Sequence, residues 1–102
     1  MKKKALAQEL APAAMLAKAL LTPKNEEECR ALLEDLCTAA EIEEMSRRLY
    51  AARMLRDGAG YLTVVGQTGL STATISRVSR ALKNGTGYAT VLSRMEGEEN
   101  DG

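Results

Sequence analysis

The segment Thr68–Leu82, which reads TGLSTATISRVSRAL, constrains the fold more than any other part of this chain. Gly69 can adopt the left-handed backbone angles that end one helix, and Ser71 stands where it can cap the next. The apolar residues of the segment recur at the spacing of one helix face: Leu70, Ile75, Val78 and Leu82. The pattern therefore predicts two short helices, about 61–68 and 72–84, joined by a tight turn.

The polar residues of the second short helix suit a DNA groove. In a helix-turn-helix the second helix enters the major groove, where small side chains let its backbone approach the base edges. The expected base-reading residues are Thr72, Ala73, Thr74 and Ser76, and the expected phosphate contacts are Arg77, Arg80 and Lys83. Ser71 completes the candidate DNA-binding site, and Ser79 is also assigned to the outward faces. An ordinary solvated helix is the alternative interpretation.

Helix-start signals organise the chain before this segment. Asn25 precedes three glutamates and predicts the N-cap of a helix that ends near Leu36. Thr38 and Glu41 have the spacing of a capping box, which predicts a further helix to Asp57. The apolar residues predicted to face inward from these two helices are Cys29, Leu32, Leu33, Leu36, Ile42, Met45, Leu49, Ala52 and Leu55.

Composition supports an all-α fold, because the 102-residue chain lacks Phe and Trp and is rich in Ala and Leu. Pro12 either opens the first helix or kinks it. A last short helix is expected at 88–95. A chain of this size buries a modest core and often needs a partner, which favours an oligomer. The predicted organisation is an N-terminal helical arm at 1–25, a helical domain at 26–95 with the helix-turn-helix at 61–84, and a disordered acidic tail at 96–102.

The net charge of zero conceals a strong division along the chain. Residues 26–44 contain eight acids and one base, whereas residues 45–94 contain eight bases and one acid. A local positive field attracts a polyanion such as double-stranded DNA. The alternative is that the acidic and basic segments neutralise each other within the fold.

Other function classes find little support in the sequence. The chain has no His and offers no acid–base partner for its hydroxyls, so we expect no enzymatic activity. Cys29 and Cys37 lie in apolar stripes and are predicted to be buried free thiols, so no metal or other cofactor is expected. No apolar run is long enough to span a membrane. Polar residues interrupt the N-terminal apolar segment too often for a signal peptide, which predicts a cytoplasmic protein.

Two runs of the chain resemble the Trp repressor superfamily, in particular its YerC/YecD type: DLCTAAEIEEMSRRLYAARMLRDG and TGLSTATISRVSRALKNGTGY. The match spans about Glu26 to Met95, and TATISRVSRAL is its most specific part. The resemblance implies an all-helical, intertwined homodimer. Each subunit would carry one helix-turn-helix reading head, with the helices before Asp57 forming the shared core.

In that family an amino-acid corepressor lies between the third helix and the recognition helix. The matching positions, which the resemblance implies as a candidate effector pocket, are Thr38, Arg48, Thr74 and Arg77. Three other matches fail, since Val78 replaces a glycine, Ala81 a serine and Cys37 a leucine. The valine would occupy space that a flat indole needs, which disfavours L-tryptophan. Val78 also lies on the predicted inward stripe, which favours a filled core over an open pocket.

The resulting prediction is a homodimeric, sequence-specific DNA-binding transcription regulator, acting as a repressor. One alternative is a dimeric protein-interaction module that has the same fold and does not bind DNA. Another is a repressor gated by a small effector other than tryptophan, because Arg48 and Arg77 are both present.

Overall fold

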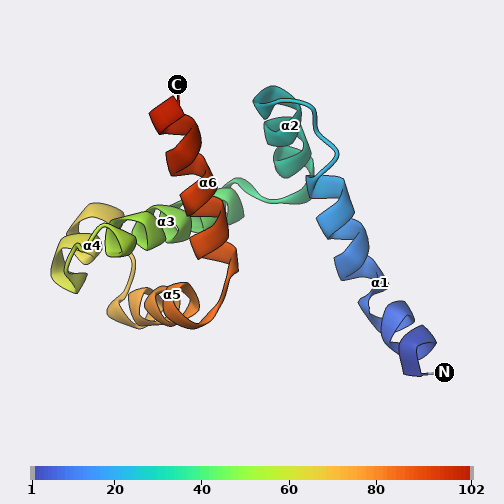
Figure 1. Cartoon of the computed structure of the whole chain (residues 1–102), viewed down its shortest axis with the longest axis horizontal. Coiled ribbons are helices and arrows are strands. Elements are labelled where there is room, and N and C mark those ends of the chain that lie inside the picture. The colour runs from blue at the N-terminus through green and yellow to red at the C-terminus, as the bar shows by residue number, and fades with distance from the viewer. Residues whose placement is uncertain (1, 102) are drawn as a thin grey trace. The chain divides into compact units, whose positions relative to one another are not determined.

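A computed structural model describes the backbone of residues 2–101 and the side chains of residues 11–97 (Figure 1). Over that range all regular secondary structure is helical, as predicted. The helices are α1 (Lys2–Leu20), α2 (Glu26–Leu36), α3 (Ala39–Arg56), α4 (Tyr61–Thr68), α5 (Thr72–Asn84) and α6 (Gly87–Asp101). The bounds of α4 and α5 confirm the two predicted short helices. None of these helices is long and apolar enough to cross a membrane.

The chain divides into two compact units, unit 1 (residues 1–42) and unit 2 (residues 43–102). Unit 1 contains α1, α2 and the first turn of α3. Pro12 lies inside α1, so the helix does not begin at this proline, which was one of the two predicted alternatives. Unit 2 contains the rest of α3 together with α4, α5 and α6.

Unit 1 buries little apolar surface. None of its described side chains, residues 11–42, is buried. Cys29 and Cys37 are free thiols but are half-buried, so the prediction that they are buried is wrong for the single chain. Leu36, predicted to face inward, is 52% exposed. The apolar stripe of α2 is real, but too few side chains of unit 1 cover it.

Helix caps in unit 1 follow the sequence closely. The Asn25 side-chain oxygen accepts a hydrogen bond from the Glu28 N–H at 2.8 Å. The Thr38 N–H donates to Glu41 Oε1 at 2.8 Å, and the Glu41 N–H donates to Thr38 Oγ1 at 3.1 Å. This reciprocal pair is the predicted capping box. The Thr38 amide, followed by its hydroxyl, favours the charged carboxylate and lowers the pKa of Glu41 below its ordinary value of 4.5.

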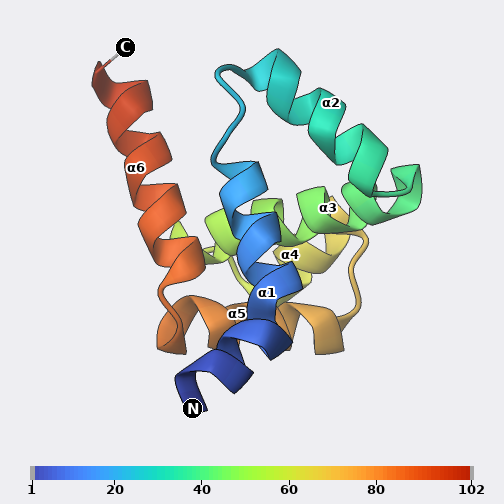
Figure 2. The same cartoon turned by 90° about the vertical axis from the view of Figure 1, so that its right-hand side faces the viewer.

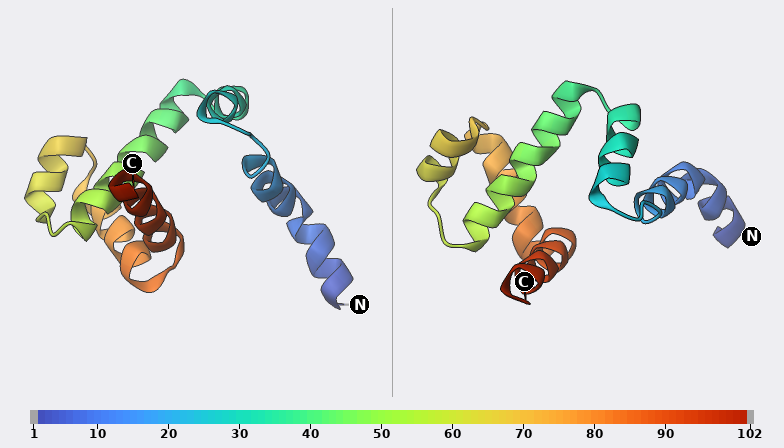
Figure 3. Two further views of the ribbon diagram at one scale, coloured as in Figure 1. Left: turned by 45° about the horizontal axis from the view of Figure 1, so that its top comes forward. Right: turned by 90° about the horizontal axis from the view of Figure 1, so that it is seen from above.

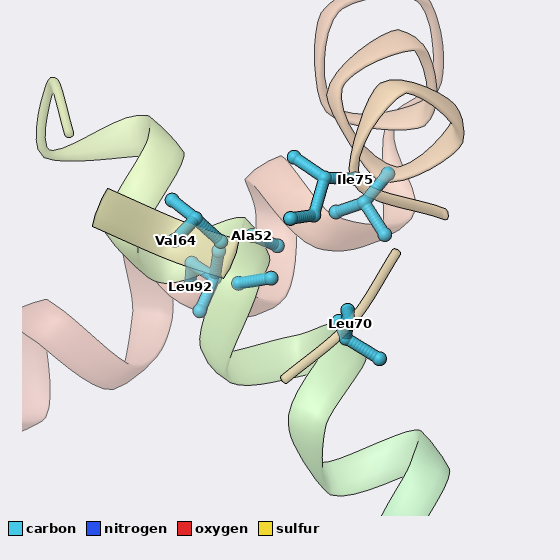
Figure 4. Packing of buried hydrophobic residues seen from close by; sticks show 7 residues of the cluster. Ala52, Val64, Leu70, Ile75 and Leu92 are labelled. Atoms are coloured by element: carbon cyan, nitrogen blue, oxygen red, sulfur yellow. The ribbon is translucent and has the colours of Figure 1, made fainter. Parts of the chain in front are cut away.

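The core of unit 2 lies where α4, α5 and α6 meet the C-terminal half of α3 (Figures 2 and 4). Its buried apolar residues come from all four helices and from the turn before α5: Ala51, Ala52, Val64, Leu70, Ile75, Val78 and Leu92. Ile75 and Val64 are the largest side chains that are fully buried. The predicted inward stripe of the helix-turn-helix is therefore confirmed, with Leu82 partly buried at its end.

The inward stripe predicted for α3 is only partly correct. Ala52 is buried, and Ala51, which was not predicted, is buried beside it. Met45 and Leu49 are 37% and 36% exposed, so the prediction that they face a core is wrong for the single chain. The two small alanine side chains leave room for the other helices to approach α3 closely. The described side chains cover Met45 and Leu49 only in part.

The C-terminal helix is longer than predicted. α6 continues to Asp101, whereas the sequence predicts a helix end at Met95 and disorder from Glu96. Leu92 anchors α6 in the core of unit 2. In the same unit, α4 lies beside the C-terminal end of α3 in both views of Figure 3. Arg56 Nη2 on α3 donates to Glu96 Oε2 at 2.6 Å and to Ser93 Oγ at 3.4 Å. Glu96, which belongs to the predicted disordered tail, is therefore bound to α3. The last residue of that tail, Gly102, lies outside the described residues.

Truncation of the core should destabilise unit 2 strongly. We expect Ile75→Ala to lower the free energy of unfolding by about 2–5 kcal/mol, because it leaves a cavity at a fully buried position. The matched control is Leu62→Ala on α4, where the side chain is 85% exposed and the expected change is within about 0.5 kcal/mol. Urea unfolding followed by circular dichroism measures both variants. Equal losses would show that this core does not hold the fold.

The capping box should weaken in acid. The pKa of Glu41 is lowered on folding, so the stabilisation that it gives is present above about 4.5 and is lost as the pH falls through the lowered value. We expect Thr38→Ala to raise the pKa of Glu41 partway, because the backbone amide contact remains. A carbon-detected NMR titration of the Glu41 carboxyl measures this. Thr22→Ala removes a threonine hydroxyl outside the capping box and should leave the titration of Glu41 unchanged.

Candidate functional site

The turn between α4 and α5 is held by two adjacent residues. Gly69 has a φ of 72°, in the left-handed region, and its N–H donates to the Val65 carbonyl oxygen at 2.8 Å. The Thr68 hydroxyl donates to the Val64 carbonyl oxygen at 2.7 Å and accepts from the Leu70 N–H at 3.2 Å. The roles predicted for Gly69 and Leu70 are confirmed. Thr68 was not singled out, because its burial depends on how α4 and α5 pack.

One face of α5 is committed to the core. Ile75 and Val78 are buried, and Leu82 is partly buried against the same cluster. Ser79 is only 6% exposed, so its prediction as an outward residue is wrong. Ser79 follows Ile75 by four positions, and residues with that spacing share one face of a helix.

A second face of α5, the outer face, consists of Thr72, Ala73, Ser76, Arg80 and Lys83. Thr72, Ala73, Arg80 and Lys83 are exposed, and Ser76 is half-buried. Arg80 and Lys83 have no ion-pair partner among the side chains that the structure describes, whereas Arg47 and Arg56 are paired with Glu43 and Glu96. The outer face therefore presents two uncompensated cations beside small polar side chains.

The first turn of α5 is capped by Ser71. The Thr74 N–H donates to Ser71 Oγ at 3.1 Å, which satisfies one of the open amides at the helix start. Ser71 Oγ also donates to Thr74 Oγ1 at 3.0 Å. Ser71 was predicted both as a cap and as a member of the DNA-binding site. The structure confirms the cap.

A third face of α5, the cavity face, lines a hollow of about 310 Å³ between α5, α3 and the start of α6. The residues of this cavity are Glu44, Arg48, Thr74, Arg77, Val78, Ala81 and Tyr88. Three of the four predicted effector-pocket residues meet here. The fourth, Thr38, belongs to unit 1, where it caps α3, and is not among the described residues that line the cavity.

The cavity differs from the sequence-based expectation in two ways. Val78 is buried in the core as predicted, yet it forms one wall of an open space instead of filling it. Glu44 and Tyr88 also line the cavity, although neither was predicted to do so. Glu44 stands one turn before Arg48 on α3, a spacing that could have indicated a shared face. Tyr88 lies at the start of α6. Its position beside α5 depends on the path of the loop between the two helices, which residue spacing does not predict.

The electrostatics of the cavity favour a negatively charged group. Arg48 is half-buried and Arg77 is exposed, and no ion pair to either is found among the described side chains. Guanidinium groups without a carboxylate partner are strong donors to oxyanions. Glu44 supplies one opposing charge in the same cavity. In the described part of the chain no cluster of His, Cys, Asp or Glu could hold a metal ion.

The sequence of this chain matches one protein family over most of its length. Residues 12–96 match the family described as Trp repressor protein. YerC, an uncharacterized protein of Bacillus subtilis strain 168, is 50% identical over 66 residues, which are 65% of this chain and 64% of the relative. The match thus spans less than two thirds of the length of that relative.

Two solved structures share the fold. A candidate Trp repressor from Staphylococcus aureus is 43% identical, with a TM-score of 0.79, and the match covers 88% of this chain and 93% of the other. A TrpR-like protein from Eubacterium eligens ATCC 27750 is 39% identical, with a TM-score of 0.79 and coverages of 87% and 95%. With the family match over most of its length, the chain belongs to the Trp repressor family.

Proposed function

We propose that this protein is a homodimeric, sequence-specific DNA-binding regulator of transcription, acting as a repressor in the cytoplasm. The observation that carries the proposal is the outer face of α5, where small polar residues and the unpaired Arg80 and Lys83 lie on one exposed stripe. Such a stripe, presented after a glycine turn, fits the major groove of double-stranded DNA. The family to which the chain belongs consists of regulators, which supports the same reading.

We assign base contacts and phosphate contacts to different residues of α5 because their side chains differ in size and charge. Thr72, Ala73 and Ser76 lie toward the helix N-terminus, where small groups allow close approach to base edges. Arg80 and Lys83 lie farther along and can reach phosphates on either side of the groove. Thr74 and Arg77 belong to the predicted DNA-binding site and also line the cavity.

Exposed apolar surface supports the homodimer. Leu49, Tyr88 and Val91 line an apolar groove of about 430 Å³ on unit 2, and Met95 on α6 is also exposed. The described part of unit 1 has no buried side chain. A chain that leaves this much apolar surface uncovered gains stability by burying it against a second copy. A two-fold dimer would place its two recognition helices about 34 Å apart, one turn of DNA.

Selection of bound duplexes from a random pool tests this function directly. We expect a palindromic preference with half-sites about one helical turn apart, which would report DNA binding and two-fold symmetry together. Arg80→Ala should weaken binding to all sequences and lower the salt slope by about 1, whereas Ala73→Ser should alter base preference. Arg30→Ala, which removes an exposed arginine paired with Glu26 in unit 1, is the control.

A complete lack of salt-dependent duplex binding at low ionic strength would refute the DNA-binding proposal. The protein-interaction module would then be the better assignment. Loss of the salt slope in Arg30→Ala to the same degree as in Arg80→Ala would show instead that binding is electrostatic and not localised on α5.

The cavity supports a second candidate function, gating by a small effector. Arg48, Arg77 and Thr74 converge on a space of about 310 Å³, which lies at the small end of ligand sites. Val78 occupies one wall with its branched side chain, and this disfavours a flat indole such as that of L-tryptophan. Two guanidinium groups and a hydroxyl instead suit a compact oxyanion.

Thermal-shift measurements with amino acids and small anions test gating. An effector present at 100 times its Kd should stabilise the protein by about 2.7 kcal/mol, which raises Tm. We expect Arg48→Gln to abolish the shift, because it removes a half-buried guanidinium from the cavity. Arg94→Gln, an exposed arginine of α6, is the matched control. Uniformly unchanged Tm values across the screen would count against an effector.

A further inference from the structure

The hydroxyl groups at the start of α5 are not equivalent. Four of them lie within six residues, on Ser71, Thr72, Thr74 and Ser76. By residue type all four could read bases. Their hydrogen bonds and their places on the helix separate them into two pairs, Ser71 with Thr74 and Thr72 with Ser76.

Ser71 and Thr74 bond to each other. A serine hydroxyl has one hydrogen to donate and two lone pairs to accept with. Ser71 Oγ donates its hydrogen to Thr74 Oγ1 at 3.0 Å and accepts the Thr74 N–H at 3.1 Å. The donor of Ser71 is therefore occupied within the helix and is not available to a base edge.

Helix geometry reinforces this separation. Thr74 shares its face with Arg77, Val78 and Ala81, and all four line the cavity. Thr72, Ala73 and Ser76 lie instead on the outer face with Arg80. Thr72 and Ala73 are exposed, and Thr74 and Ser76 are both half-buried, so the helix face and not the burial distinguishes Thr74 from Ser76. Contact with DNA through the outer face would thus bring Thr72, Ala73 and Ser76 to the bases.

We propose that Ser71 is a positioning residue, which holds the first turn of α5 through Thr74 and makes no base contact of its own. This inference rests on the proposed DNA-binding function and assigns sequence reading to Thr72, Ala73 and Ser76. The two hydrogen bonds between Ser71 and Thr74 keep the first turn helical before DNA arrives. Without it, that turn would have to be ordered on binding, which weakens every base contact that the turn makes.

Hydroxyl deletions separate positioning from reading. We expect Ser71→Ala to weaken binding to the selected duplex about fivefold, the order of an N-cap contribution, and to reduce discrimination evenly at all contacted base pairs. Ser71→Thr retains a hydroxyl that can cap, and it should bind like the unmodified protein. Thr72→Val deletes a hydroxyl on the outer face and should relax preference at one base pair only. Anisotropy titrations, normalised to the active fraction, measure each affinity against single-base variants of the duplex.

A double-mutant cycle tests the link to Thr74. Thr74→Val removes the acceptor of the Ser71 hydrogen but leaves the backbone N–H. We expect Ser71→Ala combined with Thr74→Val to weaken binding no more than Ser71→Ala alone, because both delete the same interaction. Circular dichroism confirms that each variant is folded before binding is compared.

Three results would overturn the inference. A change of preference at a single base pair in Ser71→Ala would make Ser71 a reader. Additive losses in the cycle would show that the two hydroxyls act independently. Failure of the unmodified protein to bind any duplex would remove the DNA-binding proposal itself, and this inference with it; either of the first two results would leave that proposal intact.

Discussion

Burial of Ile75 in one cluster with the alanines of α3 is the packing on which the rest of unit 2 depends. Ile75, Ala51 and Ala52 have no exposed surface, and Val64 and Leu92 complete the same cluster. Small residues on α3 allow close approach, and the branched side chains of α4 and α5 fill the remaining space. Fixing α5 in this way also fixes its other two faces. The exposed stripe and the cavity wall thus follow from one packed interface.

The helices, and the local hydrogen bonds at their ends, can be predicted from the sequence. The capping box at Thr38 and Glu41, the cap at Ser71 and the glycine turn at Gly69 each depend on residues within four positions of one another. Such interactions are encoded by spacing alone. The inward stripe of α5 is predicted for the same reason, since helical periodicity determines which residues share a face.

Features that depend on contacts between helices could not be read from spacing. Met45 and Leu49 belong to a regular apolar stripe, yet the stripe is covered only near Ala52. The pairing of Arg56 with Glu96 joins residues 40 positions apart, and Tyr88 reaches the cavity through a loop. Ser79 could have been assigned to the core from its spacing to Ile75; its polarity outweighed that signal. On a helix with one buried face, the position of a residue predicts its burial better than its polarity does.

Three faces on a helix of 13 residues leave little room for independent roles. Val78 belongs to both the core and the cavity wall, so its volume affects the stability of the reading head and the space open to a ligand. A smaller residue there would enlarge the cavity but remove contacts from the core. A larger one would strain the core as it closed the cavity. The valine therefore ties the size of any effector to the stability of the helix proposed to read DNA.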